Sequence, residues 1–179
     1  MTGRILGAVL AGGRSSRFGS DKAVALFEHR SLLDHAIAAL SDQVDTVVIC
    51  GRDLSARPCL PDRPGPNLGP LGGLAAALRH AMDHGYEAVV SAGCDTPMLP
   101  ADLVLRLQCA GPVSFLRELP VTGLWPAAVS TDLDRFIVDS PSRAMRAWAA
   151  SVRAVAVDLP RPIANINTVQ DLRRLELAS

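Results

Sequence analysis

The stretch ILGAVLAGGRSSRFGSDK, residues 5–22, decides the fold. Its first part, Ile5–Ala11, is a short apolar run without strict alternation, which is typical of a parallel strand with both faces covered. Two glycines follow, and then basic and hydroxyl residues as far as Lys22. Ligands of open α/β sheets bind outside the carboxyl ends of the strands. We therefore expect an α/β protein with a ligand site in this loop.

Two further segments have the character of buried parallel strands, namely Thr46–Cys50 and Ala88–Ala92. Helical patterns follow each strand: residues 31–40 capped by Ser31, about 71–82 ending near Gly85, and 100–107 with Pro100 in the first turn. This alternation implies right-handed crossovers between parallel strands. We predict one domain, residues 1–179, with a doubly wound, mostly parallel sheet in a Rossmann-like, three-layer α/β/α arrangement.

The patterns after residue 110 are weaker. The expected elements there are strands at 113–116, 127–129 and 154–157, a helix over 142–150 capped by Ser142, and a final helix opened by Thr168. Asp171, three residues after Thr168, completes a capping box. Residues 57–70 contain five prolines and are long enough to be a candidate functional loop.

Composition excludes several classes of function. The chain has 18 basic and 18 acidic residues and no net charge, whereas nucleic-acid binders usually carry a basic excess. No apolar stretch approaches the ~20 residues that cross a bilayer, and the apolar start is too short for a signal peptide. The four cysteines lack the two-residue spacing of metal knuckles; they are Cys50, Cys59, Cys94 and Cys109. We expect reduced thiols in a cytoplasmic protein with no nucleic-acid or membrane partner.

The loop after the first strand has the chemistry of a triphosphate site. Gly12 and Gly13 allow close backbone approach and can turn consecutive N–H groups toward an anion. Arg17 and Lys22 add positive charge, and two serines add donors. The loop is neither a P-loop nor a Gly-x-Gly-x-x-Gly fingerprint. The alternative interpretation is an ordinary glycine-rich turn with solvated basic residues.

Asp95 follows the third strand directly, in the sequence Cys-Asp-Thr-Pro. A carboxylate at this edge of the sheet, facing a phosphate loop, suits Mg²⁺. In isolation the same residues would be read as a turn. The glycines near Gly73, at the start of the second helix, let a ligand approach exposed N–H groups, although they also serve tight helix packing.

Other polar residues have competing interpretations. Asn165 and Asn167 would share one side of an extended segment and offer paired amides, or would simply precede a capped helix. His80 and His84 are four residues apart on a helix, but no third metal ligand is evident, so a solvated helix face is expected. The two tryptophans, at positions 125 and 148, are expected in the core.

Four motifs in order resemble those of the nucleotidyltransferases that include sugar-phosphate and molybdenum-cofactor enzymes. The first is Leu-Ala-Gly-Gly at residues 10–13, followed by Arg-x-Gly at 17–19 and Lys22; the others are the acidic turn at 94–97, the Gly-rich segment at 69–74 and Asn-x-Asn-Thr at 165–168. The molybdenum cofactor guanylyltransferases are the most similar family, and the resemblance covers the chain nearly end to end.

The resemblance implies transfer of GMP from Mg-GTP to the phosphate of molybdopterin, with release of pyrophosphate. It implies catalytic roles for Arg17, Lys22 and Asp95, with Asp95 as the Mg²⁺ ligand. Nucleotide-binding residues would be Leu10, Ala11, Gly12, Gly13, Lys22, Asp62 and Asp95, with Asp62 accepting hydrogen bonds from guanine. Acceptor-binding residues would be Gly73, Asn165 and Asn167. Residues 1–110 would then bind nucleotide, and residues 111–179 the acceptor.

The chain departs from the family pattern at three places. Cys50-Gly51 stands where an Asn is common, Val169-Gln170 replaces Pro-Glu, and residues 119–128 match poorly. Molybdopterin cytidylyltransferase and sugar-phosphate nucleotidyltransferase therefore stay open as alternatives. Further alternatives are a non-catalytic nucleotide-binding regulator and an adaptor that delivers cofactor. For the guanylyltransferase interpretation, the resemblance also implies transient contact with molybdoenzymes or cofactor chaperones.

Overall fold

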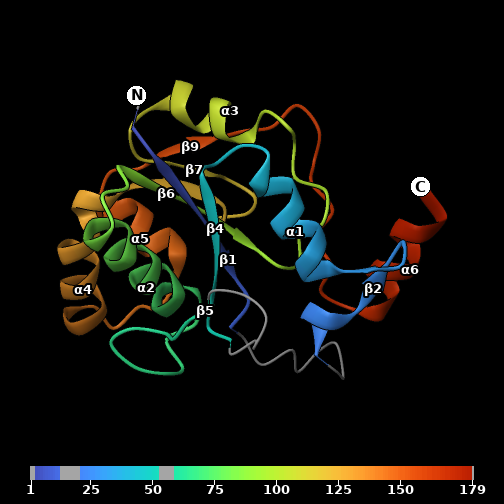
Figure 1. Cartoon of the computed structure of the whole chain (residues 1–179), viewed down its shortest axis with the longest axis horizontal. Coiled ribbons are helices and arrows are strands. Elements are labelled where there is room, and N and C mark those ends of the chain that lie inside the picture. Colours follow the sequence, from blue (N-terminus) through green and yellow to red (C-terminus); the bar gives the residue numbers. More distant parts are fainter. Residues whose placement is uncertain (1–2, 13–20, 53–58, 179) are drawn as a thin grey trace.

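The computed structural model describes residues 3–12, 21–52 and 59–178. Within these residues a seven-stranded sheet has the order β5-β4-β1-β6-β8-β7-β9 (Figure 1). The strands are β1 (Ile5–Leu10), β4 (Thr46–Cys50), β5 (Cys59–Leu60), β6 (Ala88–Gly93), β7 (Ser114–Leu116), β8 (Gly123–Pro126) and β9 (Val155–Val157). Only β8 runs antiparallel to its neighbours, β6 and β7. The predicted mostly parallel α/β sheet is confirmed.

Helices cover both faces of the sheet, and β1 shows why. Its residues are all buried and alternate between two cores. The helices are α1 (Leu32–Ser41), α2 (Pro70–Asp83), α3 (Leu103–Ala110), α4 (Ser130–Asp139), α5 (Met145–Ser151) and α6 (Val169–Ala178). Leu6, Ala8 and Leu10 face α2, α4 and α5, whereas Ile5 and Val9 face α1 and α3. A strand buried on both faces has no polar side, which explains its continuous apolar run.

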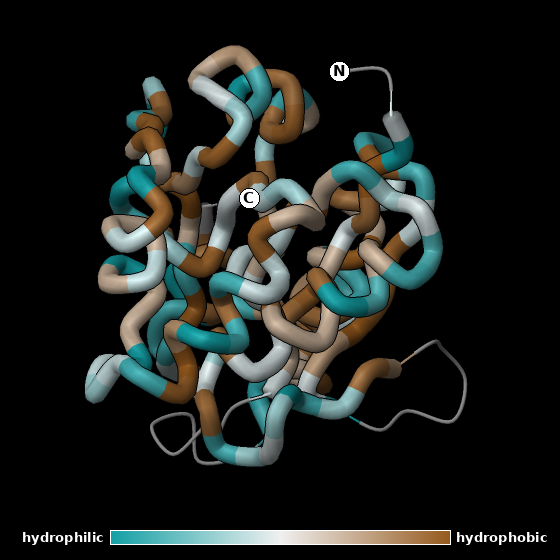
Figure 2. Tube along the Cα trace, turned by 90° about the vertical axis from the view of Figure 1, so that its left-hand side faces the viewer, coloured by the Kyte–Doolittle hydropathy of each residue, from teal (hydrophilic) through white to brown (hydrophobic). Residues whose placement is uncertain are grey.

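The expected helix caps are mostly present. Ser31 accepts a hydrogen bond from the Asp34 N–H at 3.0 Å and begins α1. Before α6, the Asp171 N–H donates to Thr168 Oγ1 at 3.1 Å, and the Thr168 N–H donates to Asp171 Oδ2 at 2.8 Å. This reciprocal pair is the predicted capping box. Along the helices, apolar and polar positions alternate in the hydropathy colouring (Figure 2), as amphipathic packing requires.

The sequence interpretation was wrong at several boundaries in the second half. Ala127–Val129 is a 3₁₀ turn, not a strand, because the pairing with β6 ends at Pro126 and the apolar residues that follow pack against α2. The helix α4 was not predicted. Pro100 lies ahead of α3, since the Leu103 N–H bonds the Pro100 carbonyl in a turn. Ser142 likewise precedes α5, where its Oγ accepts from Ala144 N–H.

A third, small core lies beside the sheet. The hairpin β2 (Leu26–Phe27) and β3 (Arg30–Ser31) packs against α6. The buried residues of this third core are Phe27, Leu32, Ile166 and Leu172. This core holds the end of the chain next to the segment that carries Lys22, as the adjacent α6 and β2 labels show (Figure 1). Among the described helices, none combines the length and apolar character of a membrane span.

Candidate active site

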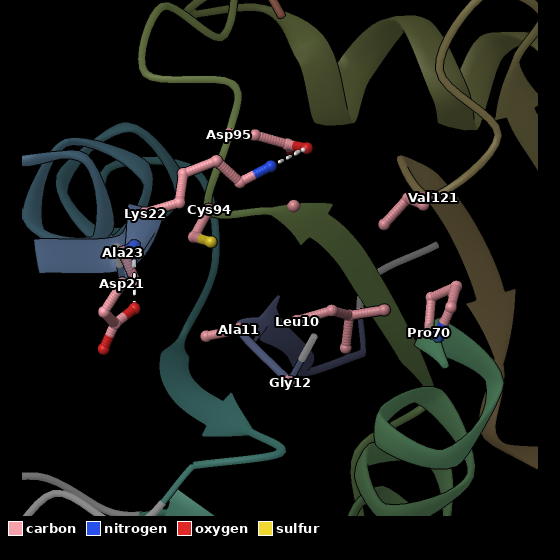
Figure 3. A pocket seen from close by; sticks show the side chains of 11 residues that line it. Leu10, Ala11, Gly12, Asp21, Lys22, Ala23, Pro70, Cys94, Asp95 and Val121 are labelled. Atoms are coloured by element: carbon pink, nitrogen blue, oxygen red, sulfur yellow. Dashed lines mark hydrogen bonds and ion pairs between the residues drawn. The ribbon is translucent and has the colours of Figure 1, made fainter. Parts of the chain in front are cut away.

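A pocket opens at the carboxyl ends of β1 and β6, the edge at which the sequence places its ligand loop. Its floor is formed by the end of β1, and Pro70 and Val121 lie across from the Asp21–Ala23 segment (Figure 3). The lining residues are Leu10, Ala11, Gly12, Asp21, Lys22, Ala23, Pro70, Gly93, Cys94, Asp95 and Val121. The pocket has a largely apolar floor and three charged side chains, those of Asp21, Lys22 and Asp95, so it suits a polar ligand.

Lys22 and Asp95 meet in this pocket. Lys22 begins a short 3₁₀ helix, η1 (Lys22–Val24), whose N-cap is Asp21; the Asp21 carboxylate accepts a hydrogen bond from Ala23 N–H at 3.2 Å. The Lys22 Nζ lies 2.9 Å from Asp95 Oδ2 (Figure 3). The side chains are 16% and 27% exposed, so both reach solvent through the pocket. The structure thus brings together two residues that the sequence separates by 73 positions.

The acidic turn is held from two sides. Thr96 Oγ1 donates to the Gly93 carbonyl at 2.9 Å within the buried turn. The Ile166 N–H donates to the Asp95 carbonyl at 2.8 Å, which fixes the Asn-x-Asn segment beside the turn. Ile166 is buried, and the asparagines on either side of it are exposed. Asn165 and Asn167 are the sequence neighbours of this contact, but neither lines the pocket, so a shared site with Asp95 stays a prediction.

Asp62 lines a second cavity that adjoins the first. That cavity is formed by Gly51, Arg52, Cys59, Pro61, Asp62 and Pro66. Gly12 and Gly51 separate the two hollows at backbone contact: a Cβ on Gly51 would lie 2.5 Å from Gly12 Cα, and Gly51 has a φ of +78°. Burial raises the pKa of the Asp62 carboxyl. Within the described residues its carboxylate has no hydrogen bond or ion pair, so its acceptor oxygens are available to a ligand.

Gly73 lies inside the packing of α2 against the sheet. A Cβ there would lie 3.0 Å from Cys50 Cβ and 3.2 Å from Leu10 Cδ2, and Asp62 Oδ1 would be 3.7 Å away. Close helix–sheet packing accounts for the missing side chain. A contact between Gly73 and an acceptor stays a prediction.

Arg52 is the main site residue that sequence reasoning missed. It follows β4 and forms an ion pair with Asp21, and its side chain is 19% exposed. The available signal was a basic residue just beyond the carboxyl end of a parallel strand. Val121 was also missed as a lining residue, because it comes from a segment without a motif, whereas Pro70 lies in the Gly-rich segment that the sequence pointed to.

Some predicted residues lie elsewhere or outside the described ranges. Gly13 and Arg17 fall within residues 13–20 and are not described. His80 and His84 stack with ring centroids 4.0 Å apart near the end of α2. No cluster of three or more metal-ligating side chains occurs in the described part of the chain. The two tryptophans are buried, at 0% and 1% exposure, as expected for core residues.

Comparison with known proteins identifies the family of the chain. A family model described as the MobA-like NTP transferase domain matches residues 7–154. The chain belongs to this family. Its MobA-like relatives include the molybdenum cofactor guanylyltransferases of Rhodobacter capsulatus, 39% identical over 97% of this chain and 95% of the relative, and of Rhizobium leguminosarum bv. trifolii, 38% identical over 96% and 91%.

Solved structures show the same MobA-like fold. The molybdopterin-guanine dinucleotide biosynthesis protein A from Archaeoglobus fulgidus has a TM-score of 0.77 at 22% identity, with 97% of each chain covered. A Mycobacterium tuberculosis protein solved in complex with manganese has a TM-score of 0.62 at 18% identity, covering 98% of this chain and 100% of that one. At these identities the likeness supports the fold alone.

Proposed function

We propose that this chain is a molybdenum cofactor guanylyltransferase, which transfers GMP from Mg-GTP to the phosphate of molybdopterin and releases pyrophosphate. The observation that carries the proposal is the convergence of Lys22 and Asp95, 2.9 Å apart, at the carboxyl edge of the sheet. Relatives with this name match the chain over nearly their full length. The charged pair at this edge of the sheet supplies the kind of groups that nucleotidyl transfer needs.

The nucleotide would span both cavities. Its phosphates would lie over Gly12 and Gly13 with Lys22 and Arg17 as cationic partners, while Leu10 and Ala11 form the floor. The base would enter the cavity beside Asp62, because a carboxylate can accept two hydrogen bonds from guanine N1 and N2. Among the described residues, only the backbones of Gly12 and Gly51 separate the two cavities where they adjoin, so one extended ligand could reach from one cavity to the other.

The donor set at Asp95 fits a magnesium ion. Mg²⁺ in phosphoryl-transfer sites typically takes one or two carboxylates and completes its shell with phosphate oxygens and water. Asp95 offers one carboxylate to the pocket, and its ion pair with the Lys22 ammonium supports a preference for positive charge at this position. When bound, Mg²⁺ would supply positive charge to the phosphate oxygens of the nucleotide.

In the proposed reaction, a phosphate oxygen of molybdopterin forms a bond to the α-phosphorus of GTP. The bond from the α-phosphorus to the bridging oxygen breaks, and its electron pair leaves with pyrophosphate. The attacking phosphate is already anionic near neutral pH, so this chain needs no strong general base. Its side chains align the reactants and offset charge, which are the main sources of rate in such transfers.

The acceptor would bind on the side of residues 111–179. Asn165 and Asn167 are exposed beside the acidic turn, and Val121 forms the facing wall of the pocket. We place molybdopterin between them, with Gly73 as a further expected contact. The reaction would take place in the cytoplasm, where cysteine thiols stay reduced. Transient contact with molybdoenzymes or cofactor chaperones belongs to the same proposal.

The test is release of pyrophosphate with GTP, CTP, ATP or UTP, each with and without molybdopterin. Among the four nucleotides we expect release only with GTP, and only when molybdopterin is present. Release that depends on a sugar phosphate would overturn the acceptor assignment, and release with CTP would overturn the base assignment. Asp95→Ala and Lys22→Ala should each lower turnover at least ~10²-fold. Asp139→Asn, on the exposed face of α4, is the control. Near-normal turnover by Asp95→Ala would contradict its role as metal ligand.

A further inference from the structure

Arg52 lies at the junction of the two cavities, two residues beyond the end of β4. It lines the cavity of Asp62, while its guanidinium Nη2 forms an ion pair with Asp21, a lining residue of the neighbouring pocket. Its Nε also points toward the Ala11 carbonyl, at 3.4 Å. The guanidinium thus spans from the loop after β4 to the segment that precedes Lys22.

Asp21 has two tasks in this arrangement. One carboxylate oxygen accepts from the Ala23 N–H and caps η1, and the other pairs with Arg52 (Figure 3 shows the capping contact). The hydrogen bond from Arg52 lowers the pKa of Asp21, so the carboxylate stays ionised throughout the neutral range. A full negative charge therefore stands in the wall of the pocket that, by the proposed function, receives a triphosphate.

An unpaired carboxylate at this position would repel the phosphates. Asp21 also caps a three-residue 3₁₀ turn, and such short turns have few internal hydrogen bonds, so the ion pair with Arg52 helps to hold the capping carboxylate in place. Lys22 is the first residue of that turn and reaches Asp95 from it. The pairing with Arg52 offsets the charge of Asp21, so that the Lys22–Asp95 pair, and not an uncompensated carboxylate, faces a ligand beside this wall.

We propose that Arg52 is a positioning residue of the nucleotide site, which acts through Asp21 by cancelling its charge and fixing the turn that carries Lys22. The inference rests on the proposed function, since it takes the ligand of the pocket to be Mg-GTP. A positioning role can be distinguished from a direct contact with the nucleotide by one measurement. If Arg52 acts through Asp21, the effect of removing Arg52 on binding depends on the charge of Asp21.

The experiment is a double-mutant cycle on the binding of Mg-GTP by calorimetry. Arg52→Gln should raise the Kd roughly tenfold, the size expected for one uncompensated charge near a polyanion at a half-buried site. Asp21→Asn keeps an oxygen for the Ala23 N–H and should change the Kd by less than about threefold. The double variant should return to within about threefold of Asp21→Asn alone. Arg30→Gln, an exposed arginine on the β2–β3 hairpin, is the matched control and should bind as the wild type does.

Two outcomes would overturn the inference. If the double variant binds as weakly as Arg52→Gln or more weakly, Arg52 contacts the nucleotide itself. If Arg52→Gln folds and binds normally, the pair has no role in binding. Should Arg52→Gln fail to fold by circular dichroism, Arg52→Met, which keeps the aliphatic stem, replaces it in the same cycle.

A second probe separates this inference from the proposed function. The cycle is repeated with magnesium tripolyphosphate, which has the charge of the nucleotide but no base. A wild type that binds tripolyphosphate but not GTP would refute the guanylyltransferase proposal and still test Arg52 through the cycle. A wild type that binds neither would refute both.

Discussion

Ser91→Ala should destabilise the protein through a buried hydrogen-bond chain behind the pocket. Ser91 lies in the middle of β6 and is fully buried. Its Oγ accepts from Trp125 Nε1 at 2.9 Å and donates to the Val121 carbonyl at 2.6 Å. The substitution removes one oxygen and adds no bulk, so the loss of stability reports these two bonds.

The magnitude follows from the burial of the two partners. The indole N–H of Trp125 is left without an acceptor in the core, which costs about 1–3 kcal/mol. The Val121 carbonyl belongs to a half-buried residue and can bond water instead, so its contribution is smaller. We expect a total loss of roughly 2–3 kcal/mol in the free energy of unfolding.

Urea unfolding followed by tryptophan fluorescence measures this loss by linear extrapolation. Ser41→Ala is the control, because Ser41 Oγ also donates to a backbone carbonyl, that of Ile37 at 2.8 Å, but on the exposed side of α1. It should change stability by no more than about 0.5 kcal/mol. A Ser91→Ala loss no larger than that of the control would refute the reasoning.

Three further predictions concern titratable groups. Asp62→Asn should reduce the preference for GTP about 10- to 100-fold, because hydrogen bonds to a charged group contribute about 1.5–3 kcal/mol. Unchanged selectivity in competition assays would show that Asp62 does not recognise the base. Burial raises the pKa of Asp62 in the folded state above its unfolded value, so its ionisation destabilises the fold above the folded pKa and costs nothing below the unfolded one. The same variant should therefore be more stable than the wild type at pH 7 but not in acid below the unfolded pKa, and an equal difference at both would contradict this. For the thiols, mass spectrometry after iodoacetamide treatment at pH 8 should find exposed Cys109 alkylated well before Cys94, whose pKa burial raises to about 11; equal rates would show that the pocket is open to reagents.

The sequence predicted the first half of the fold well because its elements carry local signals. Strands such as β1 and β6 are buried on both faces and show it as apolar runs, and Ser31 and Thr168 mark helix starts through their own hydroxyls. The second half is governed by tertiary contacts. Ala127–Val129 is apolar because it packs on α2, and nothing in its composition distinguishes that from a strand.

The candidate site also has parts that the sequence could predict and parts that it could not. Lys22 and Asp95 could be placed at one edge because both follow parallel strands, whose carboxyl ends coincide. The pairing of Arg52 with Asp21 could not, since it depends on how two loops 31 residues apart in the sequence fold over the end of the sheet. The hydrogen bond between the Ile166 N–H and the Asp95 carbonyl could not be predicted either, because it joins two backbone groups and leaves no side-chain signal.

The small core between the hairpin and α6 limits how this protein can be divided. Residues 165–178 supply the bond to the acidic turn and pack under the segment that presents Lys22. A truncated variant ending near residue 160 would lose a support of the donor site along with the asparagines. A chimera that takes its carboxyl-terminal segment from a relative must also take the matching hairpin, because otherwise the new segment has no complementary surface to pack against.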